Sequence, residues 1–147
     1  MDYDKLEAGP VTDALVAEKV MGWKERLIGG AVKVWGVPAD KDKSPEGNRW
    51  EAQFLVGVWK PSVSIAAVWL VVERMRSLGY RIYISEFTDG FYIKFVAKGR
   101  NYDDTAWQEM QRKDVEASIC RAALKAIADD TTMTHSEARP DIKGESV

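Results

Sequence analysis

Aromatic and cationic side chains that alternate along predicted strands are the residues best suited to chemistry in this sequence. Trp35 alternates in phase with Lys33, and Trp59 immediately precedes Lys60. Planar rings can stack on a planar ligand, while a nearby lysine or arginine meets its anionic group. The pattern predicts that these side chains point outward and are exposed. It predicts a site for a small nucleotide-like ligand, with these candidate contacts: Trp35, Trp59, Lys60, Tyr92, Lys94, Trp107 and Arg112.

Two other interpretations compete for the same aromatic residues. Aromatic residues on strands commonly pack under covering helices, where the ring is buried and only its polar atom remains in contact with water. Trp, Tyr and Arg are also the residue types that anchor protein–protein interfaces. The burial of these side chains and the shape of the surface around them distinguish the three interpretations.

Nucleophilic catalysis is not expected from this composition. The only histidine, His135, lies in a polar C-terminal stretch, where a general base would lack positioning. The only cysteine, Cys120, lies in an alanine-rich helical stripe and is expected to be a core residue. An enzyme that uses carboxylates alone, either Asp103 with Asp104 or Glu86 with Asp89, is a third hypothesis. The sequence does not place either pair together, so we expect no enzyme.

No metal or other cofactor is expected either. Asp40, Asp42, Ser44 and Glu51 have the spacing of a calcium loop, but Pro45 occupies the place that requires glycine. Asp103 and Asp104 are more typical of a loop or a helix cap than of a metal site. Gly29-Gly30 is an isolated pair, which indicates a turn rather than a phosphate-binding loop.

Length and composition favour a single globular domain in a reducing compartment. The chain has 147 residues, of which 46% are hydrophobic and 30% charged. A net charge of −2 argues against binding of polymeric nucleic acid. One cysteine excludes an internal disulfide, and no apolar run approaches the length of a membrane span. The polar start, residues 1–10, does not have the pattern of a secretory signal, so we expect a cytoplasmic protein without a membrane partner.

The elements that must position these residues follow from hydrophobic periodicity. A short helix over 13–21 is capped by Thr12 and ended by Gly22, and strands are predicted over 31–38 and 50–59. Residues 63–78 predict a deeply buried helix, since its first two turns are apolar almost all round; Ser62 or Ser64 caps it.

The second half of the chain predicts a β-hairpin and a final helix. The alternating segments 80–85 and 91–97 flank Thr88-Asp89-Gly90, a tight-turn signal. A short helix is expected around 105–111 and a longer one over 115–128. We therefore expect an α+β fold, an α/β/α sandwich with about three helices and one four-stranded, largely antiparallel sheet, in the order α-ββ-α-ββ-α. Residues 12–128 form this single domain, and 129–147 form a polar, disordered tail.

Three stretches resemble the phage ABA sandwich domain family of small phage and prophage accessory proteins. They are Leu15-Val16-Ala17-Glu18-Lys19-Val20-Met21-Gly22-Trp23, Ile65-Ala66-Ala67-Val68-Trp69-Leu70-Val71-Val72-Glu73 and Ser118-Ile119-Cys120-Arg121-Ala122-Ala123-Leu124-Lys125-Ala126. The Met-Gly-Trp ending is the most specific part, since helix amphipathicity does not require it. The resemblance implies a sheet between helices and a phage or prophage origin, and it supplies no catalytic motif.

The resemblance and the aromatic pattern together predict a non-enzymatic phage or prophage accessory protein that works in the host cytoplasm. Its expected partner is a nucleotide-like small molecule, and one concrete role is sequestration of a host immune signal. The alternative is a protein–protein interaction module, either a structural accessory of the phage or an inhibitor of a host protein. Both the ligand-binding protein and the interaction module are compatible with a homo-oligomer.

Overall fold

The computed structural model describes residues 2–38, 50–88, 90–100, 108–111 and 114–138. A 3-10 turn precedes the first helix, and a π-helical turn continues that helix to its end. The elements in chain order are η1 (Tyr3–Lys5), α1 (Pro10–Leu15), η2 (Val16–Val20), β1 (Lys24–Ile28), β2 (Val32–Pro38), β3 (Trp50–Leu55), α2 (Ile65–Ser77), β4 (Tyr80–Phe87), β5 (Gly90–Ala97), β6 (Gln108–Gln111) and α3 (Val115–Ala138).

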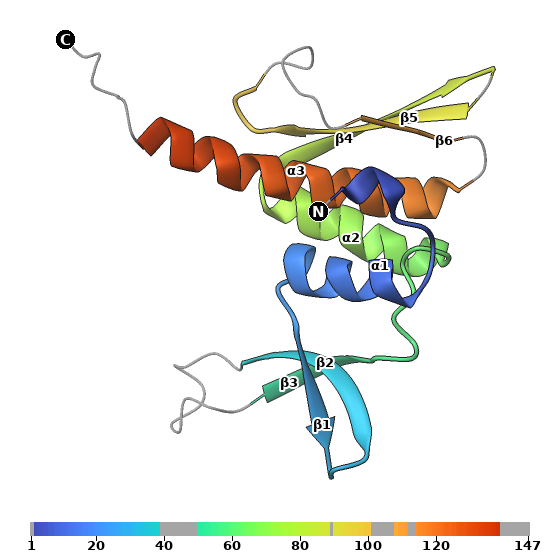
Figure 1. Cartoon of the computed structure of the whole chain (residues 1–147), viewed down its shortest axis with the longest axis vertical. Helices are drawn as coiled ribbons and strands as arrows, with labels where there is room; N and C mark the ends of the chain where they lie inside the picture. The colour runs from blue at the N-terminus through green and yellow to red at the C-terminus, as the bar shows by residue number, and fades with distance from the viewer. Residues whose placement is uncertain (1, 39–49, 89, 101–107, 112–113, 139–147) are drawn as a thin grey trace.

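The strands form two antiparallel sheets on opposite sides of the helices. One sheet has the order β1-β2-β3 and the other β4-β5-β6. Figure 1 shows α1, α2 and α3 lying between them. The expected α+β class is therefore confirmed, but two three-stranded sheets replace the single four-stranded sheet, and helices lie between sheets rather than around one.

The two strands that the sequence pattern missed are short and polar. All five residues of β1 are exposed, and three of them are charged. Strand β6 occupies Gln108–Gln111, where a short helix was expected, and it pairs with Phe91–Lys94 of β5. Neither strand has the alternation that identifies a half-buried strand. Their backbone hydrogen bonds to a neighbouring strand define them, and these do not depend on side-chain pattern.

The N-terminal helix begins earlier than Thr12. Gly9 is its N-cap and Pro10 its first residue, a position where proline's fixed φ and missing N–H cost nothing. The helix ends before Gly22, as expected, and Gly22 has a φ of +75°. Residues 2–9, which the sequence predicts only as a lead-in, contact α3. Arg121 Nη1 donates to the carbonyl oxygen of Leu6 at 2.7 Å, and Lys125 pairs with Asp4 at 2.7 Å.

Helix α2 confirms the expected position but not the expected depth of burial. Ser64 is its N-cap and accepts a hydrogen bond from the backbone N–H of Ala67 at 3.2 Å. Val68, Val71, Val72 and Met75 are fully buried. The opposite face is open, with Trp69 50% exposed. An almost uniformly apolar helix was expected to be covered all round, whereas the described residues pack against it on one side only.

The β4–β5 hairpin is confirmed, with a register in which Phe87 pairs with Gly90. Ile93 and Phe95 of β5 are fully buried.

Helix α3 continues past the expected end at residue 128 as far as Ala138, so 129–138 are helical rather than a disordered tail. No proline or glycine interrupts the sequence until Pro140. The hydrophobic core consists of buried side chains from the helices and from the inner faces of both sheets.

Candidate functional site

An aromatic cluster joins the β1–β2–β3 sheet to the helices. Gly22 turns the chain out of η2 and directs Trp23 toward the sheet. The ring of Trp23 lies 4.7 Å from that of Trp59 and 5.7 Å from that of Phe54, measured between centroids. Phe54 and Trp59 are 5.0 Å apart. Such tilted and edge-on pairs are favourable, so this cluster anchors the sheet.

Beside this cluster lies a pocket of about 330 Å3. It opens between the start of α1, strand β2 and residues 56–63, which lead from β3 to α2. Its lining is mostly apolar and includes Ala14, Trp35, Val56, Trp59, Lys60 and Val63. A concave, mostly apolar pocket with a few polar groups is the usual form of a small-molecule site.

The polar side of the pocket is built around Asp13 and Ser62. The carboxylate oxygen Oδ1 of Asp13 accepts a hydrogen bond from the backbone N–H of Ser62 at 2.8 Å. The hydroxyl oxygen of Ser62 accepts one from the N–H of Gly9 at 3.0 Å. Trp59 Nε1 donates to the carbonyl oxygen of Asp13 at 3.1 Å. These bonds fix the start of α1 against the 56–63 segment, so the pocket walls are held in place.

One buried carboxyl and one exposed lysine dominate the electrostatics of the pocket. Asp13 is only 5% exposed, and burial raises the pKa of its carboxyl above the ordinary value. Hydrogen bonds from Ser62 and the positive charge of Lys60 oppose that rise in pKa. Lys60 itself is exposed. The pocket can therefore accept a hydrogen bond beside its apolar walls and attract an anion at its rim.

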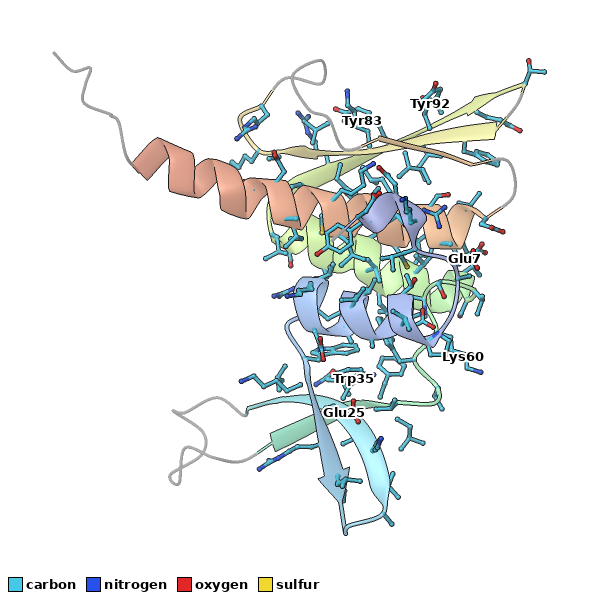
Figure 2. All side chains as sticks on the ribbon, viewed as in Figure 1. Glu7, Glu25, Trp35, Lys60, Tyr83 and Tyr92 are labelled. Carbon is cyan, nitrogen blue, oxygen red and sulfur yellow. The ribbon has the colours of Figure 1, made fainter. Side chains whose placement is uncertain are left out.

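Three of the sequence-predicted contact residues meet at this pocket: Trp35, Trp59 and Lys60. The expectation that the two tryptophans are exposed is wrong, since they are 2% and 1% exposed. The face of β2 that carries Trp35 turns toward the helices (Figure 2). Lys33 lies on the same face nearer the β1–β2 turn, is exposed, and pairs with Glu25 at 3.6 Å.

Two other predicted contacts, Tyr92 and Lys94, do not join this pocket. Tyr92 and Lys94 lie on the β4–β5–β6 sheet, and Figure 2 shows Tyr83 and Tyr92 on its side turned away from the helices. Lys94 is opposite Tyr83 and is buried at 3% exposure, which is not the exposed cation that the pattern predicts. Trp107 and Arg112 lie outside the described residues.

Two residues of the site were assigned other roles from the sequence. At the sequence level, an aspartate such as Asp13 in the first turn of a helix is simply favourable next to the positive helix end, and Ser62 is a candidate helix cap. Their sequence separation of 49 residues hides the hydrogen bond between them. The available signal was the helical spacing that puts Asp13 on the same face as Val16, Ala17 and Val20, because an acid on a buried face normally has a partner.

The groups considered for catalysis are not assembled in the described part of the chain. Cys120 is fully buried, and burial raises the pKa of its thiol far above the ordinary value, as expected for a core cysteine. His135 belongs to α3 and not to a disordered tail, but its side chain is outside the described residues. The same is true of Asp103, Asp104, Asp89 and the loop that resembles a calcium site.

Within the described ranges, no three His, Cys, Asp or Glu side chains gather as metal ligands. A search for long apolar helices in the same ranges finds none that could cross a bilayer.

Comparison with protein families matches residues 14–124 to the family described as the phage ABA sandwich domain. Searches of curated proteins and of solved structures gave no significant match.

Proposed function

Since the chain belongs to the phage ABA sandwich domain family, we propose that it is a non-enzymatic accessory protein that binds a small nucleotide-like ligand in the pocket beside α1. In the host, the protein would act in the cytoplasm by holding this ligand away from its receptor, as in sequestration of an immune signal. The convergence of Trp35, Trp59 and Lys60 on one pocket is the observation that carries the proposal.

The pocket matches such a ligand in size and in chemistry. About 330 Å3 is at the lower end of the usual range, roughly 300–1,000 Å3, and suits one base with its sugar. Apolar walls from Trp35 and Val56 favour a planar ring, and Asp13 offers an acceptor environment for the N–H groups of a base. Lys60 lies where it would meet a phosphate.

The same geometry limits both the stacking and the charge that the pocket offers to a ligand. Trp59 already packs against Trp23 and Phe54, so a ligand would contact only the part of the Trp59 ring that lines the pocket. One lysine opposes one buried carboxyl, which favours a ligand with a single phosphate near the rim over a polyphosphate chain. A mononucleotide unit, free or within a cyclic oligonucleotide, fits these constraints.

Isothermal titration tests the proposal directly. The panel contains mononucleotides, cyclic di- and trinucleotides, ADP-ribose and the corresponding nucleosides. We expect at least one phosphorylated compound to bind with Kd below millimolar, and Lys60→Ala to weaken it by about tenfold, the effect of losing one charge-assisted contact of roughly 1.4 kcal/mol. The affinity of the Lys60→Ala variant for the matching nucleoside, which has no phosphate, should differ little from that of the wild type.

Two further variants separate the pocket from other binding surfaces. Ala14→Leu places additional side-chain volume in the pocket and should abolish binding. Lys24→Ala removes an exposed lysine from β1, away from the pocket, and should leave binding unchanged. The proposal fails if no compound binds tighter than millimolar, or if Lys24→Ala and Lys60→Ala weaken binding equally.

A protein–protein module is the second candidate, and one observation favours it. The end of the β1–β2 hairpin exposes Leu27, Ile28 and Val32 at 58%, 52% and 47%. Exposed apolar side chains gathered at one place are common where a partner binds. Native mass spectrometry of gently purified protein distinguishes the candidates, because a small added mass supports a ligand and the mass of a bound host protein supports a module.

A further inference from the structure

The polar end of the pocket beside α1 offers acceptors rather than donors to a ligand. Gly9 N donates to the hydroxyl oxygen of Ser62 at 3.0 Å, and Ser62 N donates to Oδ1 of Asp13 at 2.8 Å. Trp59 Nε1 donates to the carbonyl oxygen of Asp13 at 3.1 Å. These N–H groups are already engaged with protein acceptors, so a ligand placed beside Asp13 gains no hydrogen bond from them.

The carboxyl group of Asp13 keeps unused acceptor capacity. An ionised carboxylate has about four lone-pair sites. In the described part of the chain, Ser62 supplies its hydrogen bonds, one from the backbone N–H and one from the hydroxyl. About two sites therefore remain, and Asp13 lines the pocket although it is only 5% exposed. A ligand without donors at this end would cover the carboxylate and leave those sites without a partner, which is costly.

The common bases differ in the edge that they can turn toward such a carboxylate. Guanine presents two adjacent donors, the ring N1–H and the exocyclic amino group N2–H2, which match the two oxygens of a carboxylate. Adenine and cytosine present an amino group beside a ring-nitrogen acceptor, and uracil presents one N–H between two carbonyl oxygens. Each of these three bases would bring an acceptor against the carboxylate, where neither group has a proton to share.

The fold also holds this carboxylate in place before a ligand arrives. Asp13 belongs to α1 and Ser62 lies just before α2, so their hydrogen bond joins segments 49 residues apart. Ser62 is itself 2% exposed and is bound by Gly9 N. Because these neighbours fix the carboxylate, a ligand does not have to order it, and less of the free energy of its contacts is lost on binding.

We propose that the pocket selects guanine nucleotides, and that the Asp13 carboxylate accepts hydrogen bonds from N1–H and N2–H of the base. This inference rests on the proposed function and names the base of its nucleotide-like ligand. The guanine ring lies against Trp35 and Val56, and the single phosphate meets Lys60 at the rim of the pocket. Hydrogen bonds to an ionised acceptor are about twice as strong as neutral ones, so the contacts with Asp13 decide which base binds.

Nucleotides that differ only in the base test this selection on the wild-type protein. Isothermal titration compares the 5′-monophosphates of guanosine, inosine, adenosine, cytidine and uridine, so that the phosphate and the sugar stay the same. GMP should bind tightest. IMP keeps N1–H but lacks the 2-amino group, so it should bind about tenfold more weakly. AMP, CMP and UMP should bind roughly a hundredfold more weakly or less, because each leaves the buried carboxylate facing an acceptor.

An exchange of specificity tests the role of Asp13. Asp13→Asn replaces one acceptor oxygen by an NH2 donor, which matches the carbonyl oxygen that xanthine carries in place of the 2-amino group. The ratio of GMP affinity to that of xanthosine monophosphate should therefore fall at least about tenfold, with a gain in xanthosine monophosphate affinity that misfolding cannot produce. Glu18→Gln makes the same chemical change at an exposed residue of η2 and should leave the ratio unchanged.

The outcomes separate this inference from the proposed function. If no nucleotide binds tighter than millimolar, the proposed function fails and guanine selection fails with it. If AMP or UMP binds as tightly as GMP, the pocket still holds a nucleotide, but guanine selection is overturned. An unchanged affinity ratio in Asp13→Asn would also overturn the inference, since another group would then distinguish the bases.

Discussion

At the scale of single residues, the central feature is a carboxyl that the fold buries and then satisfies. Asp13 is held by the backbone N–H of Ser62, and its own carbonyl oxygen accepts from Trp59. A buried acid is costly unless it is hydrogen-bonded, and its protonated form is less costly than its charged form. Asp13 therefore connects two segments that are far apart in the sequence and also links the stability of the fold to pH.

The sign of that pH dependence follows from the raised pKa of Asp13. Because burial holds this pKa above the ordinary 3.8, the native state keeps a proton that the unfolded chain has already lost. The resulting stability is present at low pH and is lost as the pH rises through the native pKa. Asp13→Asn keeps an oxygen for the Ser62 N–H but carries no charge, so its free energy of unfolding relative to wild type should rise from acidic to neutral pH.

Urea denaturation of both proteins at several pH values measures this difference. The wild type serves as the reference at each pH, which cancels the titration of all other groups. If the variant loses the same free energy at every pH, the hydrogen bond rather than the charge decides the role of Asp13. If its relative stability falls as the pH rises, attraction between the Asp13 carboxylate and Lys60 outweighs burial.

At the scale of elements, the turn over Met21-Gly22-Trp23 decides where the first sheet is attached. Met21 N donates to the carbonyl oxygen of Val16, and Trp23 N donates to that of Ala17, which closes the helix end. Gly22 has a φ of +75° there, a conformation that other residues adopt only with strain. This gives a physical reason for a glycine at this position in a stretch that resembles the family: the turn directs Trp23 into the aromatic cluster.

Gly22→Ala should accordingly destabilise the fold by about 1 kcal/mol, the usual cost of placing alanine at positive φ. The cost is conformational rather than steric, since the nearest atom to an added Cβ is Arg74 Nη2 at an ordinary 3.6 Å. Gly57→Ala is the matched control, because Gly57 has neither a positive φ nor an atom within 4 Å of an added Cβ. Chemical denaturation that shows equal losses for both variants would refute this role of Gly22.

At the scale of the whole molecule, the two sheets differ in how firmly they are attached. The β4–β5–β6 sheet covers α2 and α3 with fully buried residues of β5, Ile93 and Phe95 among them. The β1–β2–β3 sheet, which lies on the far side of α1 from the other sheet (Figure 1), is attached through the aromatic cluster. All residues of its edge strand β1 are exposed. Few buried contacts imply a low free energy for local opening.

Hydrogen exchange read by mass spectrometry should resolve this asymmetry. Amides of β5, the central strand of its sheet, should exchange slowest among the strands, and those of β1 should exchange much faster. Trp23→Ala should accelerate exchange in β2 and β3 more than in β5, because it removes a ring of the cluster that anchors only the first sheet. Equal protection of β1 and β5 in the wild type would contradict the asymmetry.

Only part of the candidate site could be predicted from the sequence. The alternation of aromatic residues with cations identified Trp35, Trp59 and Lys60, which line one pocket. It also grouped Tyr92 and Lys94 with them, although they lie on the other sheet (Figure 2). Alternation within one strand fixes which side chains share a face, but two strands can present that face to different surroundings.

The sequence by itself determined the local elements: the β4–β5 hairpin, the position of α2 with Ser64 as one of its two candidate caps, and Cys120 as a core residue of α3. Turn chemistry, capping and helical periodicity act over a few residues, so they can be identified along the chain. Only the tertiary structure decided that there are two sheets, that Trp35 and Trp59 are buried, and that the described neighbours of α2 leave Trp69 half exposed. Burial depends on neighbours from distant segments, and local sequence pattern does not specify which segments those are.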